Sequence, residues 1–479
     1  MTDSSKLKKV ISKKDLFNCF IKYKNNTCFK FENKEFTYSE VFQLTCKSIS
    51  YLRSNYKKKK IVFSSYNSKD SLIFYLASIF SDYTILPIDP DLPSKEKISL
   101  KKKLKFDHLI NNFNQTKYKK HNEDVEISLK DNVFLIMMSS GTGSGQQKAI
   151  VHSAENLLNS ANEFSILAGY NEKTVLYHCL PMFYMAGIMN TFLCCIFSGS
   201  CIAVGKLARF ETLINFWKET KKMNVNSLHL TPSIFMGLCV LHSPKQEVHE
   251  HLSKYQSIIS TSSFLYPEIR KKFLNIFKRR IQSCYGITEL GGPITVESIE
   301  DVMEEDENQH SVGSHSNKIK IKIVKKNKIF IKTPYMMEGY LRENLILEKP
   351  KLKNGYFDTG DLGFYKNKKL SYLGRNKEII KIGGELVSLP YVENITLRSN
   401  LVKECAAIGK KDLFSGEILI LFVIFKEKNI SKQTIKLFNF LKKNLKKIEI
   451  PKKIIPLLQM PKTKSGKIIK TKIYDLYLK

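Results

Sequence analysis

The chain has 479 residues, of which 43% are hydrophobic and 26% are charged, so it can bury large cores and is not a globally disordered chain. Its net charge of +33 would attract polyanions, but Lys and Arg are spread along the whole length, from "SKLKKV" to "LKKNLKKIE". We interpret the charge as solvated surface lysines and expect no specific nucleic-acid partner.

The cysteines and the least polar segment indicate the compartment. The ten cysteines include no C-x-x-C pair, and the first residues lack the apolar core of a secretory signal, so we expect reduced, buried thiols in a cytoplasmic protein. No charged residue lies between Thr174 and Gly205, a run long enough to cross a membrane. Because Pro181, Gly187 and Asn190 interrupt it, we expect a strand, a loop and a buried helix, with no transmembrane span.

Short apolar strands alternate with amphipathic helices in the first part of the chain. In chain order the expected elements are the strand "KIVFSSY", the helix "SKDSLIFYLASIFSDY" opened by Ser68, the strand "TILPID", the helix "SAENLLNSANEFSILAGY", the strand–helix pair "SLHLTPSIFMGLCVL", the strand "YQSIISTSS" and the helix "YPEIRKKFLNIFKRR". This alternation predicts α/β layers with substantially parallel sheet.

The pattern changes after about Asn317. "KIKIKIVKKNKIFIKT" alternates apolar and cationic residues, which predicts a half-exposed antiparallel meander. After Arg375 a smaller unit follows, with strands at "EIIKIGGELVSLP" and "LILFVIFKE" and helices at "YVENITLRSN" and "SKQTIKLFNFLKKNLKK". We predict an α/β protein in which a large N-terminal body of layered α/β subdomains, with a barrel-like meander, precedes a C-terminal α+β domain of about a hundred residues.

One loop combines glycines, hydroxyls and a single cation. "FLIMMSSGTGSGQQKAIVHSAEN", residues 134–156, has three glycines and four hydroxyls within seven residues, and then Lys148. Bare backbone N–H groups, hydroxyls and an ammonium group can surround a phosphate, although a flexible glycine turn is also possible. The spacing matches neither G-x-x-x-x-G-K-[ST] nor G-x-G-x-x-G.

Further segments give this loop a context. They are "FTYSEVFQL" from Phe36, "LPIDPDLPSKE", "YGITE" from Tyr285, "MMEGYLRE", "YFDTGDLG" from Tyr356, "YLGRNKEIIKIGGELVSLPYVENI" and "PKTKSGKIIKTKI" from Pro461. In this order they resemble the adenylate-forming superfamily of acyl-CoA synthetases, luciferases and peptide-synthetase adenylation domains, over nearly the whole chain. The resemblance implies an adenylation domain at residues 1–374, a hinge at 375–377 and a mobile C-terminal domain at 378–479.

The resemblance also implies a two-step reaction. A carboxylate attacks the α-phosphate of MgATP and releases pyrophosphate, and a thiol then takes the acyl group from the adenylate. Two anions meet in the first step, so cations and donors arranged around the α-phosphate are needed. The implied catalytic residues are Lys467, Thr288 and Glu289. Glu289 would also hold Mg²⁺, together with Thr142, because Mg²⁺ prefers oxygen ligands.

The remaining implied roles concern binding. Asp361 would accept both ribose hydroxyls with Arg375 nearby, Tyr285 would lie against the adenine, and Lys377 would be the hinge residue. Gly383 and Gly384 would let a pantetheine arm pass close to the backbone, although a β-bulge would also explain them. The full binding set is Ser140, Gly141, Thr142, Gly143, Ser144, Gly145, Lys148, Ser262, Ser263, Tyr285, Gly286, Asp361, Arg375, Lys377, Lys381, Gly383 and Gly384.

The chain departs from the family pattern in three places. The phosphate loop has one extra residue, with Gln147 in place of proline and Ala149 in place of glycine. "STSSFLYPE" replaces a glycine-rich adenine segment, so Ser262 and Ser263 must fit where glycine is common. "LPMFYMAG" carries Tyr184 where many acyl- and aryl-CoA ligases carry histidine.

The acid itself is only broadly constrained. Phe183, Tyr184 and Met185 are candidates for the acyl pocket, although plain core packing would also explain them. Glu172 is the sole acidic residue between Asn171 and Gly205, and an unpaired ammonium would be costly in an apolar pocket, so an uncharged acyl or aryl tail is favoured over an amino acid.

The sequence therefore predicts an ATP- and Mg²⁺-dependent ligase for a small-molecule carboxylic acid, with coenzyme A as the favoured acceptor. A stand-alone enzyme that loads an acyl carrier protein through its phosphopantetheine is the alternative. A degenerate, non-catalytic nucleotide-binding relative is a third reading, suggested by the altered loops.

Overall fold

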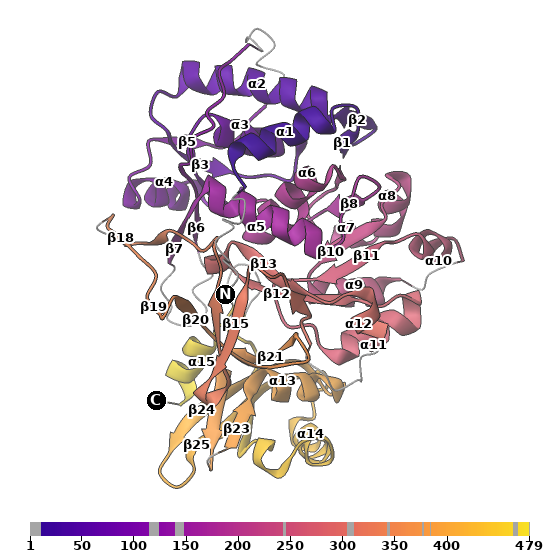
Figure 1. Ribbon diagram of the computed structural model, residues 1–479. Helices are drawn as coiled ribbons and strands as arrows, with labels where there is room; N and C mark the ends of the chain where they lie inside the picture. The colour runs from indigo at the N-terminus through magenta and orange to yellow at the C-terminus, as the bar shows by residue number, and fades with distance from the viewer. Residues whose placement is uncertain are drawn as a thin grey trace, which may run out of the picture.

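The computed structural model (Figure 1) describes residues 11–114, 124–138, 148–242, 246–303, 311–342, 345–375, 378–383, 385–462 and 468–478. The N-terminal helices lie at one end of the molecule, the C-terminal elements lie at the other end, and the meander strands lie between them. None of the helices in these ranges is both long enough and apolar enough to cross a membrane.

The first sheet of the body is mixed, with a parallel half and an antiparallel half. Its strand order is β18 (Leu347–Glu348), β17 (Gly339–Leu341), β7 (Ala149–Ser153), β6 (Val133–Met138), β4 (Thr84–Ile88), β3 (Lys60–Ser64) and β5 (His108–Ile110). Strands β3 to β6 are parallel, whereas β6 and β7 are antiparallel neighbours. The glycine-rich segment, residues 139–147, therefore joins two adjacent strands of this sheet, and it lies outside the described residues.

The second sheet repeats the parallel arrangement. Its order is β14 (Ser314–His315), β13 (Gly292–Val296), β12 (Gln282–Ile287), β11 (Ser257–Ser260), β10 (Ser227–Leu230), β8 (Val175–His178), β9 (Cys201–Val204), β1 (Thr27–Phe31) and β2 (Lys34–Thr37). Strands β8 to β12 are parallel, and β13 reverses direction. These two sheets confirm the predicted α/β body.

Helices cover the two sheets, and their N-caps follow the sequence signals. Ser68 caps α3 through the Ser71 amide, and Ser153 caps α5 through the Asn156 amide. The helices of the body are α1 (Lys13–Lys22), α2 (Tyr38–Asn55), α3 (Lys69–Phe80), α4 (Ser94–Lys103), α5 (Ala154–Leu167), α6 (Cys194–Ser198), α7 (Phe210–Leu213), α8 (Phe216–Lys222), α9 (Pro232–Leu241), α10 (Gln246–Ser253), α11 (Pro267–Phe277) and α12 (Ile299–Met303), with the π-helix η2 (Ala186–Leu193) and the 3₁₀ turns η3 (Thr288–Leu290) and η4 (Lys325–Asn327).

The uncharged segment between Thr174 and Gly205 forms β8, a loop, η2 running into α6, and β9. This confirms the predicted strand, loop and buried helix. The π-helical winding of η2 was not predicted, because a segment that is apolar on every side has no periodic polar face from which the winding could be inferred. Eight of the ten cysteines, including Cys194 and Cys195 in this segment, are buried.

The predicted meander is antiparallel, as expected. Its order is β15 (Lys320–Val324), β16 (Lys328–Lys332), β20 (Tyr356–Lys366) and β19 (Leu352–Lys353), and β21 (Lys369–Arg375) also pairs with β20. The C-terminal sheet has the order β23 (Glu385–Ser388), β22 (Ile379–Ile382), β25 (Gly416–Phe425) and β24 (Val402–Asp412), with β26 (Lys453–Pro456) beside β25. Around it lie α13 (Leu389–Arg398), α14 (Ile430–Asn444), η6 (Lys447–Glu449) and α15 (Lys470–Tyr477).

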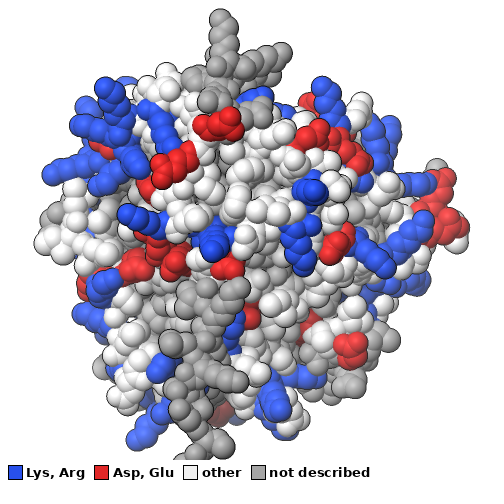
Figure 2. All heavy atoms as spheres, turned by 45° about the horizontal axis from the view of Figure 1, so that its top comes forward, with Lys and Arg blue, Asp and Glu red and all other residues white. Residues whose placement is uncertain are grey.

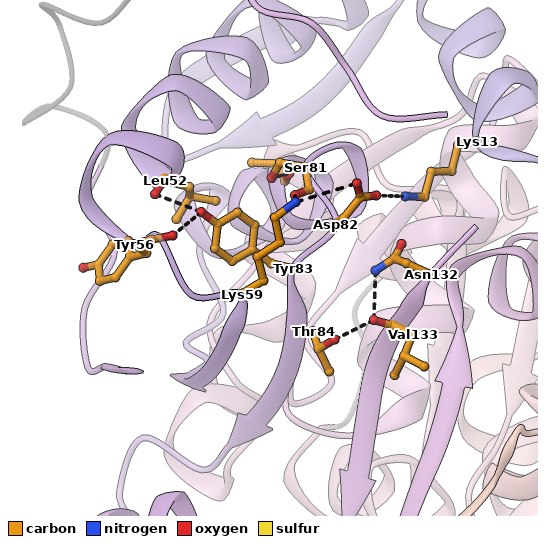
Figure 3. A network of polar contacts seen from close by, with 11 residues as sticks. Lys13, Leu52, Tyr56, Lys59, Ser81, Asp82, Tyr83, Thr84, Asn132 and Val133 are labelled. Atoms are coloured by element: carbon orange, nitrogen blue, oxygen red, sulfur yellow. Dashed lines mark hydrogen bonds and ion pairs between the residues drawn. The ribbon is translucent and has the colours of Figure 1, made fainter. Parts of the chain in front are cut away.

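A buried ion pair attaches α1 to the body (Figure 3). The fully buried Lys13 ammonium lies 2.7 Å from a carboxylate oxygen of Asp82, which follows α3. Burial lowers the pKa of Lys13, while Asp82 partly offsets that effect. Breaking such a pair from one side costs about 3–5 kcal/mol, so this contact strongly favours the docked position of α1.

The surface charge is dispersed. On the face shown in Figure 2, Lys and Arg side chains lie around the periphery and are interspersed with Asp and Glu. On this face the arrangement agrees with our interpretation of solvated surface lysines.

Candidate active site

A cavity of about 1160 Å³ lies where the body meets the meander strands. One wall comes from the loop after β8, η2, the loop before α7 and the start of α9. The remaining lining residues come mainly from the end of β6, Lys148, η3, β16 to β18, the turn within β20 and the end of β21. Segments that are far apart in the sequence therefore share a single chamber.

The meander brings Asp361 and Arg375 together. They are directly paired across the antiparallel strands β20 and β21, and the Arg375 Nε atom lies 3.4 Å from Asp361 Oδ1. The other carboxylate oxygen, Oδ2, accepts a 2.6 Å hydrogen bond from the Tyr285 hydroxyl on β12. The Tyr285 ring is packed against Tyr372, with their centroids 5.7 Å apart.

The Asp361 carboxyl is almost completely buried, and burial raises its pKa to about 6, although the Tyr285 hydrogen bond and the Arg375 charge oppose the rise. Its Oδ1 atom accepts no hydrogen bond from the described residues. Gly360, the preceding residue, lines the cavity with φ +73°, and an added Cβ would have no atom within 4 Å. An unsatisfied buried acceptor beside open space fits a ligand that carries hydroxyl groups, such as a ribose.

Glu289 lies in η3 and lines the cavity. Its Oε1 atom accepts a 3.1 Å hydrogen bond from the Tyr340 hydroxyl on β17. The Lys148 ammonium group lies over the Tyr340 ring, 4.6 Å from the centroid. Tyr340 thus positions the predicted metal-binding carboxylate and the predicted phosphate-binding cation, a role that sequence reasoning missed although "MMEGYLRE" contains it.

Thr288 lines the cavity, and its backbone carbonyl contacts the side chain of His152. His152 is a second residue that sequence reasoning missed. His152 is fully buried on β7, and its Nε2 lies 2.8 Å from the Thr288 carbonyl oxygen. Burial lowers its pKa to about 4, so the ring is neutral near pH 7 and donates this bond through Nε2–H. The contact connects η3 to the strand that follows the glycine-rich segment. A histidine in an apolar strand was the available signal.

The other predicted nucleotide-binding residues of the body are in different positions. Ser262 and Gly286 line the cavity, whereas Ser263 does not. Ser262 has φ +71°, the left-handed region that favours glycine. A Cβ on Gly286 would lie 2.1 Å from the Gly292 carbonyl oxygen, so β12 and β13 approach too closely there for any side chain.

Two of the three predicted acyl-pocket residues line the cavity. Tyr184 and Met185 line the cavity, and Phe183 does not, although its ring packs against Tyr184 with centroids 4.7 Å apart. The same wall contains apolar and small side chains together with the polar side chains of Asn190, Thr231 and Ser233.

The predicted C-terminal residues that the structure describes lie away from this lining. Lys381 is exposed on β22. Gly383 has φ +55°. A Cβ added there would lie 3.9 Å from its nearest neighbour, the Ile448 Cδ1 atom, so there is room beside this turn. Several predicted residues lie outside the described ranges, namely Ser140, Gly141, Thr142, Gly143, Ser144, Gly145, Lys377, Gly384 and Lys467.

Among the described residues, no cluster of three or more His, Cys, Asp or Glu side chains could hold a metal ion. Glu289 is a single carboxylate on the cavity wall. One carboxylate suits Mg²⁺ that arrives with a nucleotide, because Mg²⁺ typically binds one or two carboxylates together with substrate phosphates and water.

Comparisons with known proteins place this geometry in a family. The AMP-binding enzyme model matches residues 94–341, and the AMP-binding enzyme C-terminal domain model matches residues 391–467. An oxalate–CoA ligase from Arabidopsis thaliana is 26% identical over 352 residues, which cover 71% of this chain and 66% of that protein. A 2-succinylbenzoate–CoA ligase from Listeria monocytogenes is 25% identical over 347 residues, which cover 71% and 69% of the two chains. The chain thus spans about two thirds of the length of these relatives.

Solved structures show the same fold. ATP-bound MatB from Rhodopseudomonas palustris has a TM-score of 0.81 at 17% identity, covering 98% of this chain and 99% of that one. O-succinylbenzoate CoA synthetase (MenE) from Bacillus subtilis, in complex with an acyl-adenylate intermediate, has a TM-score of 0.82 at 18% identity, covering 96% and 97%. The resemblance drawn from the sequence motifs is confirmed: the chain belongs to the family of AMP-binding enzymes, in the adenylate-forming superfamily.

Proposed function

We propose that this protein is an AMP-forming ligase that joins a carboxylic acid with an uncharged tail to coenzyme A. The observation that carries the proposal is the shared cavity. Glu289 and Lys148 line it and both contact Tyr340, Asp361 directly follows the lining residue Gly360, and the described lining residues between positions 179 and 234 carry no charge.

In the first step the substrate carboxylate attacks the α-phosphorus of ATP. A carboxylate–phosphorus bond forms, the bond to the β-phosphate breaks, and pyrophosphate leaves. Asp361 and Arg375 would hold the ribose, and Thr288 and Lys148 would stabilise charge on the phosphates. Mg²⁺, when bound with ATP at Glu289 and Thr142, would neutralise phosphate charge. Lys467 would bridge the carboxylate and the α-phosphate.

In the second step a thiol attacks the acyl carbon, a thioester forms, and AMP leaves. Gly383 and Gly384 would let the pantetheine arm pass, and rotation about Lys377 would bring this part of the chain to the cavity. Coenzyme A is the acceptor we favour because the curated relatives are named as CoA ligases.

The charges that line the cavity support an uncharged tail. The described lining cations are Lys148, Lys328, Arg342, Lys349, Lys351 and Arg375, and the lining acids are Glu289, Glu348, Asp358 and Glu378. None of the described lining residues between positions 179 and 234 is charged. A second carboxylate or an ammonium on the tail would therefore be desolvated without a counter-ion from these residues.

The test is pyrophosphate release from MgATP across a panel of carboxylic acids, first without a thiol and then with coenzyme A. We expect release that depends on a particular acid, accelerates with coenzyme A, and falls at least a hundredfold in Lys467→Ala. The matched control is Lys472→Ala, which removes an exposed lysine of helix α15 that lies five residues after Lys467, and this variant should retain activity.

Three results would contradict parts of the proposal. Release that coenzyme A does not accelerate, but that a phosphopantetheinylated carrier protein does, would assign the acceptor to a carrier protein. ATP binding without release for any acid would favour a non-catalytic relative. Equal activity in Lys467→Ala would remove Lys467 from the mechanism.

A further inference from the structure

Asn190 is a buried amide on the uncharged wall of the cavity. It lies within the π-helix η2, is 2% exposed, and lines the cavity with Met185 and Ala186. π-helical turns are rare and often occur at functional sites, because the wider turn redirects side chains. The proposed reaction assigns no role to Asn190.

Contacts with the protein fix the orientation of this amide. Its Nδ2 lies 3.3 Å from His229 Nε2 and 3.2 Å from Thr261 Oγ1. The His229 ring is buried, which lowers its pKa to about 3, so the ring is neutral and can accept at Nε2 while Nδ1 faces the Tyr170 hydroxyl at 3.4 Å. The Thr261 hydroxyl oxygen accepts the other hydrogen bond from Nδ2. Both amide hydrogens of Asn190 are therefore used on the protein side.

The oxygen of the same amide has no such partner. Asn190 Oδ1 is buried and accepts no hydrogen bond from the described residues. Gly292, which lines the cavity opposite, would place an added Cβ 3.7 Å from this oxygen. A buried acceptor without a donor is costly, and a ligand that supplies the donor removes that cost.

We propose that Asn190 is a specificity-determining residue whose Oδ1 accepts a hydrogen bond from an uncharged hydroxyl group on the tail of the acid. The inference rests on the proposed ligase function and narrows its substrate to hydroxylated acids. A hydroxyl suits the site better than an ammonium, because the described residues of this wall carry no charge to balance one. A site built to bond a hydroxyl rejects the analogue that lacks it much more strongly than an apolar pocket rejects an extra hydroxyl.

The test compares pairs of acids that differ only by a hydroxyl or a methyl group at one position, such as the three hydroxybenzoates with the three toluates, and hydroxylated with methylated short-chain alkanoates. The measurement is kcat/KM for acid-dependent pyrophosphate release. We expect the wild-type protein to favour the hydroxy acid of at least one pair by roughly ten- to a hundredfold. Asn190→Leu should bring that ratio close to one and leave the rate with the methyl acid within a few-fold of wild type.

Tyr170→Phe is the matched control, because it removes a hydroxyl from the far end of the same network and keeps Asn190 Oδ1 in place. It should retain the preference, which separates loss of the acceptor from general loosening. Should Asn190→Leu fail to fold, Asn190→Asp, which keeps an oxygen but loses both donors, should shift the preference away from the wild-type pattern.

The outcomes separate the two proposals. Turnover of methyl and hydroxy acids at equal rates in every pair, or a preference that survives in Asn190→Leu, would overturn the role of Asn190 and leave the ligase intact. Absence of release with any acid would overturn the ligase and this inference together.

Discussion

At the scale of single residues, Asp361 is a buried carboxyl with a shifted pKa. Burial raises the pKa of this carboxyl to about 6, above its ordinary value of 3.8. The folded protein therefore binds the proton more tightly than the unfolded chain, and the ionised form is present mainly above pH 6. Stability conferred by the protonated form is present at low pH and is lost as the pH rises from about 4 to 6.

We expect ATP affinity to fall as the pH drops below about 6, by roughly tenfold per pH unit, because the protonated carboxyl loses acceptor capacity for the ribose hydroxyls. Isothermal titration between pH 5 and 8 measures this dependence. In Asp361→Asn the dependence should disappear and ATP binding should be weak at every pH, whereas the free energy of unfolding at pH 8 should rise by about 1–3 kcal/mol. Affinity that is independent of pH in the wild-type protein would contradict the assignment.

Candidate site residues could be chosen from the sequence where they belong to a short motif. Asp361 and Glu289 were singled out from "YFDTGDLG" and "YGITE"; Glu289 lines the cavity, and Asp361 directly follows the lining residue Gly360. Tyr340, His152 and Asn190 were not assigned roles, because each acts through a partner that is far away in the sequence. His152, for example, contacts the carbonyl of a residue 136 positions later.

At the scale of elements, the loop after β11 has a strained backbone. Ser262 has φ +71°, a conformation that costs a residue with a Cβ about 1–2 kcal/mol more than glycine. Ser262 stands where glycine is common in the family, and its backbone has a conformation that glycine favours.

We expect Ser262→Gly to raise the free energy of unfolding by about 0.5–1 kcal/mol, measured by urea denaturation, because it removes this strain. Ser263→Gly is the matched control, since Ser263 is not in the positive-φ region and should gain nothing from the change. Equal effects of the two substitutions would show that the strain is not the cause.

Helices and strands could be predicted from the sequence where the hydrophobic period and the capping residues indicated the same element. Helices α3 and α5 begin at the serines expected to cap them, and the meander alternates as its sequence does. The π-helical form of η2 and the left-handed Ser262 were not predictable, because packing against neighbouring segments determines both.

At the scale of the whole molecule, a group of polar contacts around Glu268 joins the body to the C-terminal elements. Glu268, in the first turn of α11, accepts a 2.6 Å hydrogen bond from Asn394 Nδ2 on α13 and forms an ion pair with Arg398. The Tyr266 hydroxyl also bonds the Pro390 carbonyl oxygen at 3.4 Å. The contact is partly exposed, so it can break without unfolding either partner.

We expect Glu268→Ala to speed amide hydrogen exchange in α13 roughly tenfold, because a charge-assisted hydrogen bond worth about 1.5 kcal/mol is lost. Exchange in α5 should not change. Glu247→Ala, which breaks an exposed ion pair with Lys221 on the body, is the control and should leave α13 unaffected. Unchanged exchange in both variants would show that this contact does not hold the C-terminal elements.

The sequence alone determined those strands, helices and caps whose signals lie within a few neighbouring residues, and it determined the family through motifs that keep their order. The domain boundaries and the roles of Lys467 and of the glycine-rich loop remain predictions. Only the tertiary structure decided which side chains share the cavity. Tyr285 meets Asp361 across 76 residues, and Asn190 is oriented by His229 and Thr261. Such contacts join residues that are far apart in the sequence and that meet only when the sheets pack. A short stretch of sequence therefore gives no signal of them.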